Sequence, residues 1–314
     1  MQKSVPMPQA IVDCQRAGIR VAMITGDYAA TAEAIARAAG LAVDGGILTG
    51  PELAAMDDAA LALRIRQTSI FARIMPAQKL RLVQAFKANG EVVAMTGDGV
   101  NDAPALKAAH IGVAMGGRGT DVAREAAALV LLNDDFPAIV GAVRLGRRIF
   151  GNLRKAAAYI MAGHVPIAGL ALLPRLLDWP ILLFPAHIAF LEMVIDPVCS
   201  IVFEGEPEEP DVMRRPPRRR EESLFSPGSL AASLLQGLVV LAAVLLVYDL
   251  ALPSGPDSAR SLAFVTLVMA NLCLMLVNRS WRVGFLQSLT RRNPAVWIVL
   301  AVTAAILGLA KTSP

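Results

Sequence analysis

Two aspartates around a glycine turn carry the most specific chemistry in this sequence. Asp98 and Asp102 lie in M-T-G-D-G-V-N-D-A-P-A-L, residues 95–106, directly after a short apolar stretch. Aspartate and asparagine oxygens suit Mg²⁺, which takes one or two carboxylates and completes its coordination with water and phosphate oxygens. Gly97 and Gly99 let the backbone come close to an anion, and a helix expected at residues 103–109 adds N–H groups and a positive dipole. We therefore predict that Asp98 and Asp102 bind Mg²⁺ beside a phosphoryl group.

The surrounding segments alternate between strand and helix patterns. Short apolar runs, typical of parallel strands buried on both faces, occur at residues 19–25, 69–72, 91–96, 111–115 and 128–132. Helices are expected at residues 29–39 and 76–87. This alternation predicts a doubly wound α/β domain, residues 1–150, with its ligand site at the carboxyl ends of the strands. The two T-G-D triplets, residues 25–27 and 96–98, follow strands and are expected to face one pocket.

Three more side chains are candidates for this pocket. Lys79, in the first turn of its helix, is a compact cation able to meet a phosphoryl group, although a solvated helix lysine is the alternative. Asn101 can hold a ligand oxygen or a water beside the metal. Asp27 is either part of the pocket or only a cap on the following helix.

The segment at residues 95–106 closely resembles the hinge motif of P-type ion-pumping ATPases, whose phosphorylation domain belongs to the haloacid-dehalogenase-like superfamily. The resemblance implies a pump that uses ATP and Mg²⁺ to move a cation across a membrane through an aspartyl-phosphate cycle. It also implies that both T-G-D turns bind phosphate. The implied catalytic residues are Lys79, Asp98, Asn101 and Asp102, and the implied phosphate-binding residues are Thr25, Gly26, Asp27, Thr96 and Gly97.

One part of the family's machinery is not in the sequence. The nucleophilic aspartate of P-type pumps lies in a D-K-T-G-T motif, and that string does not occur here. We therefore expect a C-terminal fragment of a pump, inactive alone, without the nucleophilic Asp, the nucleotide domain and the first membrane helices. A separately encoded N-terminal half is a candidate partner. The alternatives are a non-catalytic Mg²⁺-binding membrane protein and a gene remnant, whereas a free phosphatase of the superfamily would need a D-x-D-x-T strand that is also absent.

Composition divides the chain into a soluble and a membrane part. Hydrophobic residues make up 55% and the mean hydropathy is +0.53, values that are high for a soluble protein. Residues 151–314 contain about five apolar stretches near the length that crosses a bilayer. They are residues 156–177, 181–203, 230–252, 262–277 and 294–310, of which the fourth is short. Three scattered cysteines form no C-x-x-C pair, which argues against a zinc site and fits a reducing compartment.

Basic residues give the expected orientation in the lipid bilayer. The links at residues 214–220 and 279–292 are rich in arginine, whereas the links near residues 174–180 and 253–260 are not. Positive-inside logic places the basic links and the N-terminal domain in the cytoplasm, with the spans in the cell (inner) membrane. The net charge of +4 is explained by these loops, so no nucleic-acid partner is expected.

Ionisable residues inside the apolar stretches are candidates for cation binding. Glu192 and Asp196 lie four residues apart in F-L-E-M-V-I-D-P and are expected on one helix face, beside a carbonyl freed by Pro197. By resemblance to calcium- and sodium-type pumps, polar residues at these positions bind the transported ion. His164, near the middle of the first span, is expected to line the same cavity or to be a hydrogen-bonded structural histidine.

Overall fold

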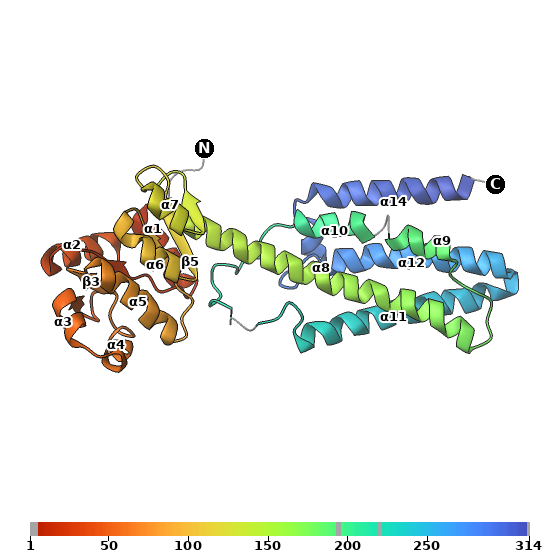
Figure 1. Ribbon diagram of the computed structural model, residues 1–314. Coiled ribbons are helices and arrows are strands. Elements are labelled where there is room, and N and C mark those ends of the chain that lie inside the picture. Colours follow the sequence, from red (N-terminus) through yellow and green to blue (C-terminus); the bar gives the residue numbers. More distant parts are fainter. Residues whose placement is uncertain (1–5, 193–195, 219–221, 313–314) are drawn as a thin grey trace. The chain divides into compact units, whose positions relative to one another are not determined.

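The computed structural model describes residues 6–192, 196–218 and 222–312 (Figure 1). The chain forms two compact units. One comprises Met1–Leu145 with Asp211–Arg220, and the other comprises Gly146–Pro210 with Glu221–Pro314. The segment at residues 211–220 belongs to the first unit because Met213 packs against its core and Pro217 lies close to Gly18.

The first unit contains two parallel sheets of three strands each. One has the order β1-β3-β2, formed by Met23–Ile24, Ile70–Ala72 and Ile47–Thr49. The other has the order β4-β5-β6, formed by Ala94–Gly97, Ile111–Met115 and Leu129–Leu131. The predicted α/β class with parallel strands is confirmed. The sequence analysis missed β2, which spans only three residues, and did not foresee that the strands divide into two sheets.

Helices cover these sheets and complete three apolar clusters. They are α1 (Met7–Arg16), α2 (Ala29–Ala39), α3 (Gly50–Ala55), α4 (Asp58–Arg64), α5 (Pro76–Ala88), the 3-10 turn η1 (Val100–Asp102), α6 (Ala103–Ala108) and α7 (Asp121–Ala126). Strand β3 is fully buried because it lies between β1 and β2. Ile24 of β1 packs against the cluster around Phe71 and also against the cluster around Met95 of β4. The two sheets therefore share a core along β1 and β4.

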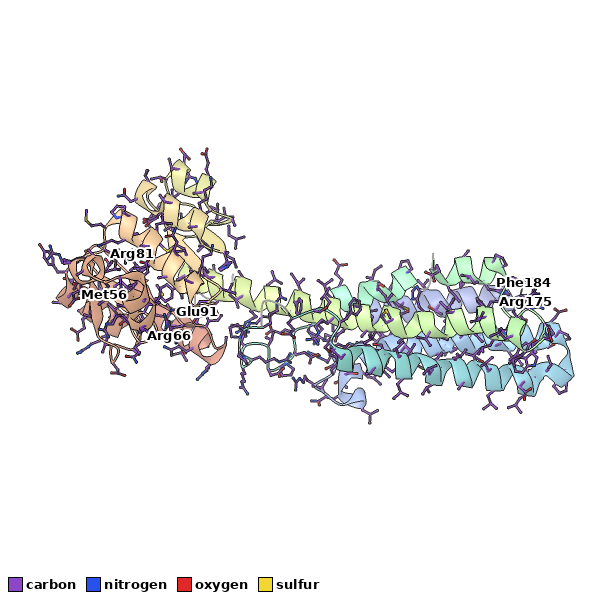
Figure 2. All side chains as sticks on the ribbon, turned by 60° about the horizontal axis from the view of Figure 1, so that its bottom comes forward. Met56, Arg66, Arg81, Glu91, Arg175 and Phe184 are labelled. Carbon is purple, nitrogen blue, oxygen red and sulfur yellow. The ribbon has the colours of Figure 1, made fainter. Side chains whose placement is uncertain are left out.

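A partly buried arginine ties α5 to α3. Arg81 donates to the carbonyl oxygens of Leu53 at 2.9 Å and Met56 at 2.7 Å, and to the Asp58 carboxylate at 2.8 Å (Figure 2). It thereby satisfies carbonyls that the C-terminus of α3 leaves open. This contact fixes the helix that carries Lys79.

The second unit is helical. Its elements are α8 (Phe136–Leu176, in this unit from Gly146), α9 (Pro185–Phe190), α10 (Asp196–Glu204), α11 (Pro227–Ala251), η3 (Leu252–Ser254), α12 (Pro256–Asn278), α13 (Phe285–Leu289) and α14 (Pro294–Thr312). Among the described residues three helical stretches are long and apolar enough to cross a membrane: Phe136–Leu176, Pro227–Ser254 and Pro256–Asn278.

Two of the predicted spans, the second and the fifth, are not among the three long apolar helices of the described part of the chain. The fourth is not short, because its helix α12 begins at Pro256 and has 23 residues. The second, residues 181–203, is described as two short helices, α9 and α10, and residues 193–195 between them lie outside the described part. The apolar part of α14, Pro294–Ala305, is shorter than the three long stretches. The second and fifth spans stay predictions.

Close approach of α8 and α11 depends on glycine. A Cβ at Gly237 would lie 2.6 Å from the Ala162 carbonyl oxygen and 2.5 Å from the Val165 Cβ. Small residues allow this approach where lipid removes the hydrophobic drive between helices. The packed core of the unit also contains an aromatic pair, Tyr159 and Phe203, with ring centres 5.4 Å apart.

Candidate functional site

The turn after β4 is built around Asp102. The whole residue is 5% exposed, and its Oδ2 atom accepts the N–H groups of Asp98 and Gly99, each at 3.3 Å. A Cβ at Gly97 would lie 2.5 Å from the Asp102 Cβ, so only glycine fits this position. The carboxylate therefore organises the backbone that precedes it.

Lys79 reaches this turn from the first turn of α5. Its Nζ atom lies 2.6 Å from Asp102 Oδ1, and the two side chains are 19% and 8% exposed. The alternative of a solvated helix lysine is therefore wrong. The pair places a cation at the edge of the turn and occupies the second oxygen of Asp102.

Asp98 and Asn101 carry the exposed, unpaired polar side chains of the same turn. Both are exposed, and within the described part of the chain neither side chain makes a hydrogen bond or an ion pair. The Asp98 carbonyl oxygen accepts the N–H of Thr120 at 2.8 Å, which brings the loop before α7 against the turn. An exposed carboxylate beside an exposed amide fits Mg²⁺, which needs few protein ligands when phosphate and water complete its shell. Asp98 fits the metal better than Asp102, whose oxygens are already engaged.

The T-G-D turn after β1 is held by its own side chains. The Thr25 hydroxyl donates to Asp27 Oδ2 at 2.8 Å and accepts the Asp27 N–H at 3.2 Å. The N-cap of α2 is Tyr28, so Asp27 does not cap that helix, and the cap alternative is wrong. No heavy atom lies within 4 Å of a Cβ built on Gly26, which leaves the turn open.

The two T-G-D turns follow strands β1 and β4, which pack against the same apolar cluster. Thr25 directly follows Ile24, which packs against the cluster that contains Met95, and Thr96 directly follows Met95. Thr96 and Gly97 are half-buried at the end of β4. The five predicted phosphate-binding residues thus lie in two turns that leave one shared core.

Asp134 fixes the loop between β5 and α7, and it was not among the predicted site residues. Its carboxylate accepts the N–H groups of Gly117 at 2.9 Å and Arg118 at 2.7 Å. Burial raises the pKa of this carboxyl, but the two N–H groups and the Arg118 charge outweigh burial and hold the pKa below its ordinary value. The sequence signal for this residue is the N-D-D run at residues 133–135, shortly after β6. In the structure Asp134 has φ 49°, an uncommon value for a residue other than glycine.

In the second unit the structure brings two predicted ion-site residues together. The His164 Nε2 atom of α8 lies 3.3 Å from Glu192 Oε1, and His164 Nδ1 lies 2.8 Å from the Ile160 carbonyl oxygen. The side chain of Asp196 lies outside the described residues. Asn271 of α12 is fully buried against Gly163, and neither amide atom has a partner among the residues that the structure describes.

A buried ionic cluster, which we call the loop cluster, lies at the link after α10. Glu206 is 0% exposed, and its Oε2 atom accepts from Arg279 Nε at 3.0 Å and from Asn293 Nδ2 at 2.8 Å. Its carbonyl oxygen accepts from Arg148 Nε at 2.9 Å and Asn152 Nδ2 at 2.8 Å. The acidic, proline-containing composition of this link is typical of a solvated linker, but its Glu206 is buried and paired.

Lys155 and Glu209 form the other half of the loop cluster. The Lys155 Nζ atom lies 2.6 Å from Glu209 Oε1, and Ser280 donates to the same carboxylate at 2.9 and 3.0 Å. Lys155 is 2% exposed, so its charge is buried within the loop cluster. Sequence reasoning missed the cluster because its members are far apart along the chain.

Comparison with known families agrees with both units. Residues 6–110 match the family described as haloacid dehalogenase-like hydrolase, and residues 180–314 match the family described as cation transporting ATPase, C-terminus. A calcium-transporting ATPase of Listeria monocytogenes is 40% identical over 86% of this chain and 31% of its own length. Calcium-transporting ATPases of Bacillus subtilis and Lactococcus lactis are 38% and 36% identical, over 95% and 94% of this chain and 34% and 33% of their lengths.

The chain thus spans about a third of the length of these relatives. The matches cover both the domain with the two T-G-D turns and the apolar helices. The chain belongs to the P-type cation-transporting ATPase family.

Proposed function

We propose that this chain is the C-terminal part of an ATP-driven P-type cation pump, with its nucleophilic aspartate, nucleotide domain and first membrane helices supplied from outside this sequence. The observation that carries the proposal is the division of the strands into two sheets. Strands β1 and β4 are the end strands of their sheets, and Ile24 joins their cores. One more parallel strand between them would complete a single sheet. Its carboxyl end would then lie between the two T-G-D turns.

The side chains of these turns have distinct roles in the proposal. Asp98 and Asn101 hold Mg²⁺, which when bound supplies positive charge to the phosphoryl group. Lys79 places a second cation beside that group, and Asp102 orients both Lys79 and the turn. Thr25, Gly26, Thr96 and Gly97 offer hydroxyl and N–H donors to phosphate oxygens. Asp27 orients the Thr25 hydroxyl.

The reaction in the joined pump is phosphoryl transfer through a covalent intermediate. A carboxylate oxygen from the missing strand forms a bond to the γ-phosphorus of ATP, and the bond to ADP breaks. Water later cleaves the acyl phosphate and releases inorganic phosphate. The residues of this chain bind, orient and neutralise the transferred group.

The cation would bind at Glu192, Asp196 and His164 in the second unit. The contact between His164 and Glu192 supports this assignment, because it joins two polar side chains from separate apolar segments. The named relatives transport calcium, and we propose a cation without fixing its identity. The proposed location is the cell (inner) membrane, with the first unit in the cytoplasm.

The test is phosphoenzyme formation. The chain is expressed alone and joined to a segment that carries D-K-T-G-T and an ATP-binding domain, either fused or as a separate N-terminal half. Both forms are incubated with γ-labelled ATP and Mg²⁺. We expect acid-stable, hydroxylamine-sensitive label only in the joined form. Label on the chain alone would contradict the proposal that its nucleophile is missing.

Two substitutions test the role of the turn in the joined form. Asp98→Asn should lower the labelling rate at least about a hundredfold, because it removes the proposed metal ligand. Asp44→Asn is the matched control, since Asp44 is exposed and outside both turns. If the two substitutions lower the rate equally, the metal role of Asp98 is wrong.

A second candidate is a non-catalytic Mg²⁺-binding membrane protein. The open carboxylate of Asp98 favours it, because the turn is folded without any further segment. It predicts Mg²⁺ binding by the chain alone that Asp98→Asn removes, together with no labelling in the joined form.

A further inference from the structure

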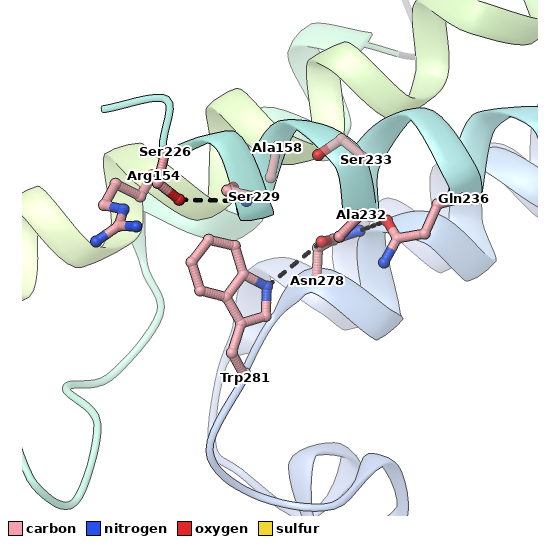
Figure 3. A pocket seen from close by; sticks show the side chains of 9 residues that line it. All are labelled: Arg154, Ala158, Ser226, Ser229, Ala232, Ser233, Gln236, Asn278 and Trp281. Atoms are coloured by element: carbon pink, nitrogen blue, oxygen red, sulfur yellow. Dashed lines mark hydrogen bonds between the residues drawn. The ribbon is translucent and has the colours of Figure 1, made fainter. Parts of the chain in front are cut away.

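A cavity in the second unit, lined by both polar and apolar side chains, has no role in the proposed pump cycle. Its volume is about 300 Å³, and α8, α11, α12 and the segment after α12 line it (Figure 3). Its polar lining includes Arg154, Ser226, Ser229, Ser233, Asn278 and Trp281. All of these residues lie in one compact unit.

Arg154 offers an unused donor to this cavity. Its NH1 group donates to Glu222 Oε1 at 3.0 Å, whereas its buried Nε has no hydrogen-bond partner within the described ranges. The guanidinium carbon lies 5.9 Å from the centre of the Trp281 ring. A buried N–H of a charged group without an acceptor is costly. An anion with several oxygens, such as phosphate, suits the planar fork of arginine.

The start of α11 adds the positive end of a long helix. Ser226 caps this 25-residue helix, and its hydroxyl accepts the Ser229 N–H at 3.2 Å. The N-terminus of a helix carries a positive partial charge that favours anions. Ser233 lines the cavity two turns further on, is 3% exposed, and makes no hydrogen bond to any described residue through its hydroxyl.

An apolar surface adjoins the cavity on the same helix. Leu235 and Val239 are 64% and 62% exposed, and they lie three positions after Ala232 and Gln236, which line the cavity. Residues three apart are neighbours on a helix surface. Trp281 is 45% exposed, and tryptophan is enriched where membrane meets water. A molecule bound in the cavity would therefore contact polar donors and, next to them, the exposed Leu235 and Val239.

We propose that the cavity binds the headgroup of an anionic glycerophospholipid. Arg154 and the N-terminus of α11 hold the phosphate, and Ser233 donates to a glycerol or ester oxygen. Leu235 and Val239 carry the start of the acyl chains. This proposal does not depend on the pump cycle. It uses none of the proposed catalytic or cation-binding residues, and its test measures lipid binding rather than phosphoryl transfer.

The test measures bound lipid on the intact chain. The purified chain in a non-ionic detergent is titrated with phosphatidylglycerol, phosphatidylcholine or inorganic phosphate, and bound molecules are counted by native mass spectrometry. We expect one tightly held phosphatidylglycerol and weaker phosphatidylcholine. Displacement of the lipid by inorganic phosphate at equal concentration would overturn the lipid assignment in favour of a free-anion site.

Arg154→Gln should weaken phosphatidylglycerol binding about tenfold, because it removes a charged donor. The matched control is Arg292→Gln, which removes the same charge from an exposed position outside the cavity. Equal losses in the two variants would show general surface attraction and overturn the proposal. Ser233→Ala should weaken binding about threefold, with Ser261→Ala on α12 as its control.

A third substitution separates lipid binding from a purely structural ion pair. Glu222→Gln breaks the pair with Arg154 but leaves the guanidinium free for phosphate. We expect it to retain or tighten phosphatidylglycerol binding. If Glu222→Gln weakens binding as much as Arg154→Gln does, Arg154 serves only its ion pair and the proposal fails.

Discussion

Two lysine–carboxylate pairs at the same distance have opposite surroundings. Lys79 and Asp102 in the first unit, and Lys155 and Glu209 in the second, each have a closest N–O distance of 2.6 Å. Around Lys79 the neighbouring Asp98 carboxylate is open and exposed. Around Lys155 the neighbouring carboxylate is also bonded by Ser280, and Lys155 itself is 3% exposed in its side chain. The turn with the first pair keeps an unpaired carboxylate, Asp98, within the described part of the chain. In the second pair, both oxygens of the Glu209 carboxylate are bonded.

The comparison of the two ion pairs teaches that such a pair indicates a binding site only when polar side chains next to it have no hydrogen-bond partner. The loop cluster joins the link after α10 to α8, α12 and the segment before α14, and its charges bond one another. Its expected role is to hold these segments together. We propose that the turn at Asp102 instead presents ligands to Mg²⁺ and phosphate.

The largest expected effect is in the loop cluster. Glu206→Gln leaves the guanidinium of Arg279 buried without a counter-charge, and should lower the free energy of unfolding by about 3–5 kcal/mol. Denaturant unfolding of the chain in detergent measures this change in the free energy of unfolding. Glu204→Gln, at an exposed position two residues earlier, should have no effect beyond about 0.5 kcal/mol. Equal effects would contradict a structural role for the cluster.

Replacing each lysine by methionine compares the two pairs directly. Lys155→Met removes the nearer counter-charge of the buried Glu209 and leaves it only Arg291, at 3.6 Å, so it should cost about 3 kcal/mol of stability. Lys79→Met should cost about 1–2 kcal/mol, because Lys79 is more exposed and solvent screens the remaining Asp102 charge. Its larger effect should be on phosphoenzyme formation by the joined pump. The contrast between the two regions fails if Lys79→Met is the more destabilising change.

The two T-G-D turns should differ in their tolerance of a methyl group. Gly97→Ala places a Cβ 2.5 Å from the Asp102 Cβ and should destabilise the chain by about 1–3 kcal/mol through overpacking. Gly26→Ala meets no atom within 4 Å and should stay within about 0.5 kcal/mol. Thermal unfolding of the two variants measures the difference. A neutral Gly97→Ala would show that the turn relaxes around the new methyl group.

The smallest effect concerns pH. The pKa of Asp134 is lowered from its ordinary 3.8, so its bonds to Gly117 and Arg118 stabilise the fold above that pH, and their contribution is lost as pH falls through the lower folded-state pKa. Asp134→Asn should therefore reduce stability at pH 7, and the gap to the unsubstituted chain should shrink below about pH 4. Unfolding curves between pH 7 and pH 3 measure this gap. A gap that stays constant with pH would exclude the ionised carboxylate as its cause.

Much of the first unit follows from local pattern. The buried apolar runs gave five of the six strands, and the residues of the two T-G-D turns were visible as a motif. Strand β2 was not, because its three residues carry little periodic signal. Asp134 was not, because its importance rests on N–H groups that lie sixteen and seventeen positions away.

The sequence by itself determined the family, the parallel α/β class and the apolar character of the second half, since these depend on residue type and on spacing along the chain. Only the tertiary structure decided which charges are free and which are paired. Lys79 and Lys155 cannot be distinguished by their neighbours in sequence, and neither can Asp98 and Asp102 be ranked as ligands. Their roles depend on burial and on partners from distant segments, because the energy of a charge is set by what replaces its water.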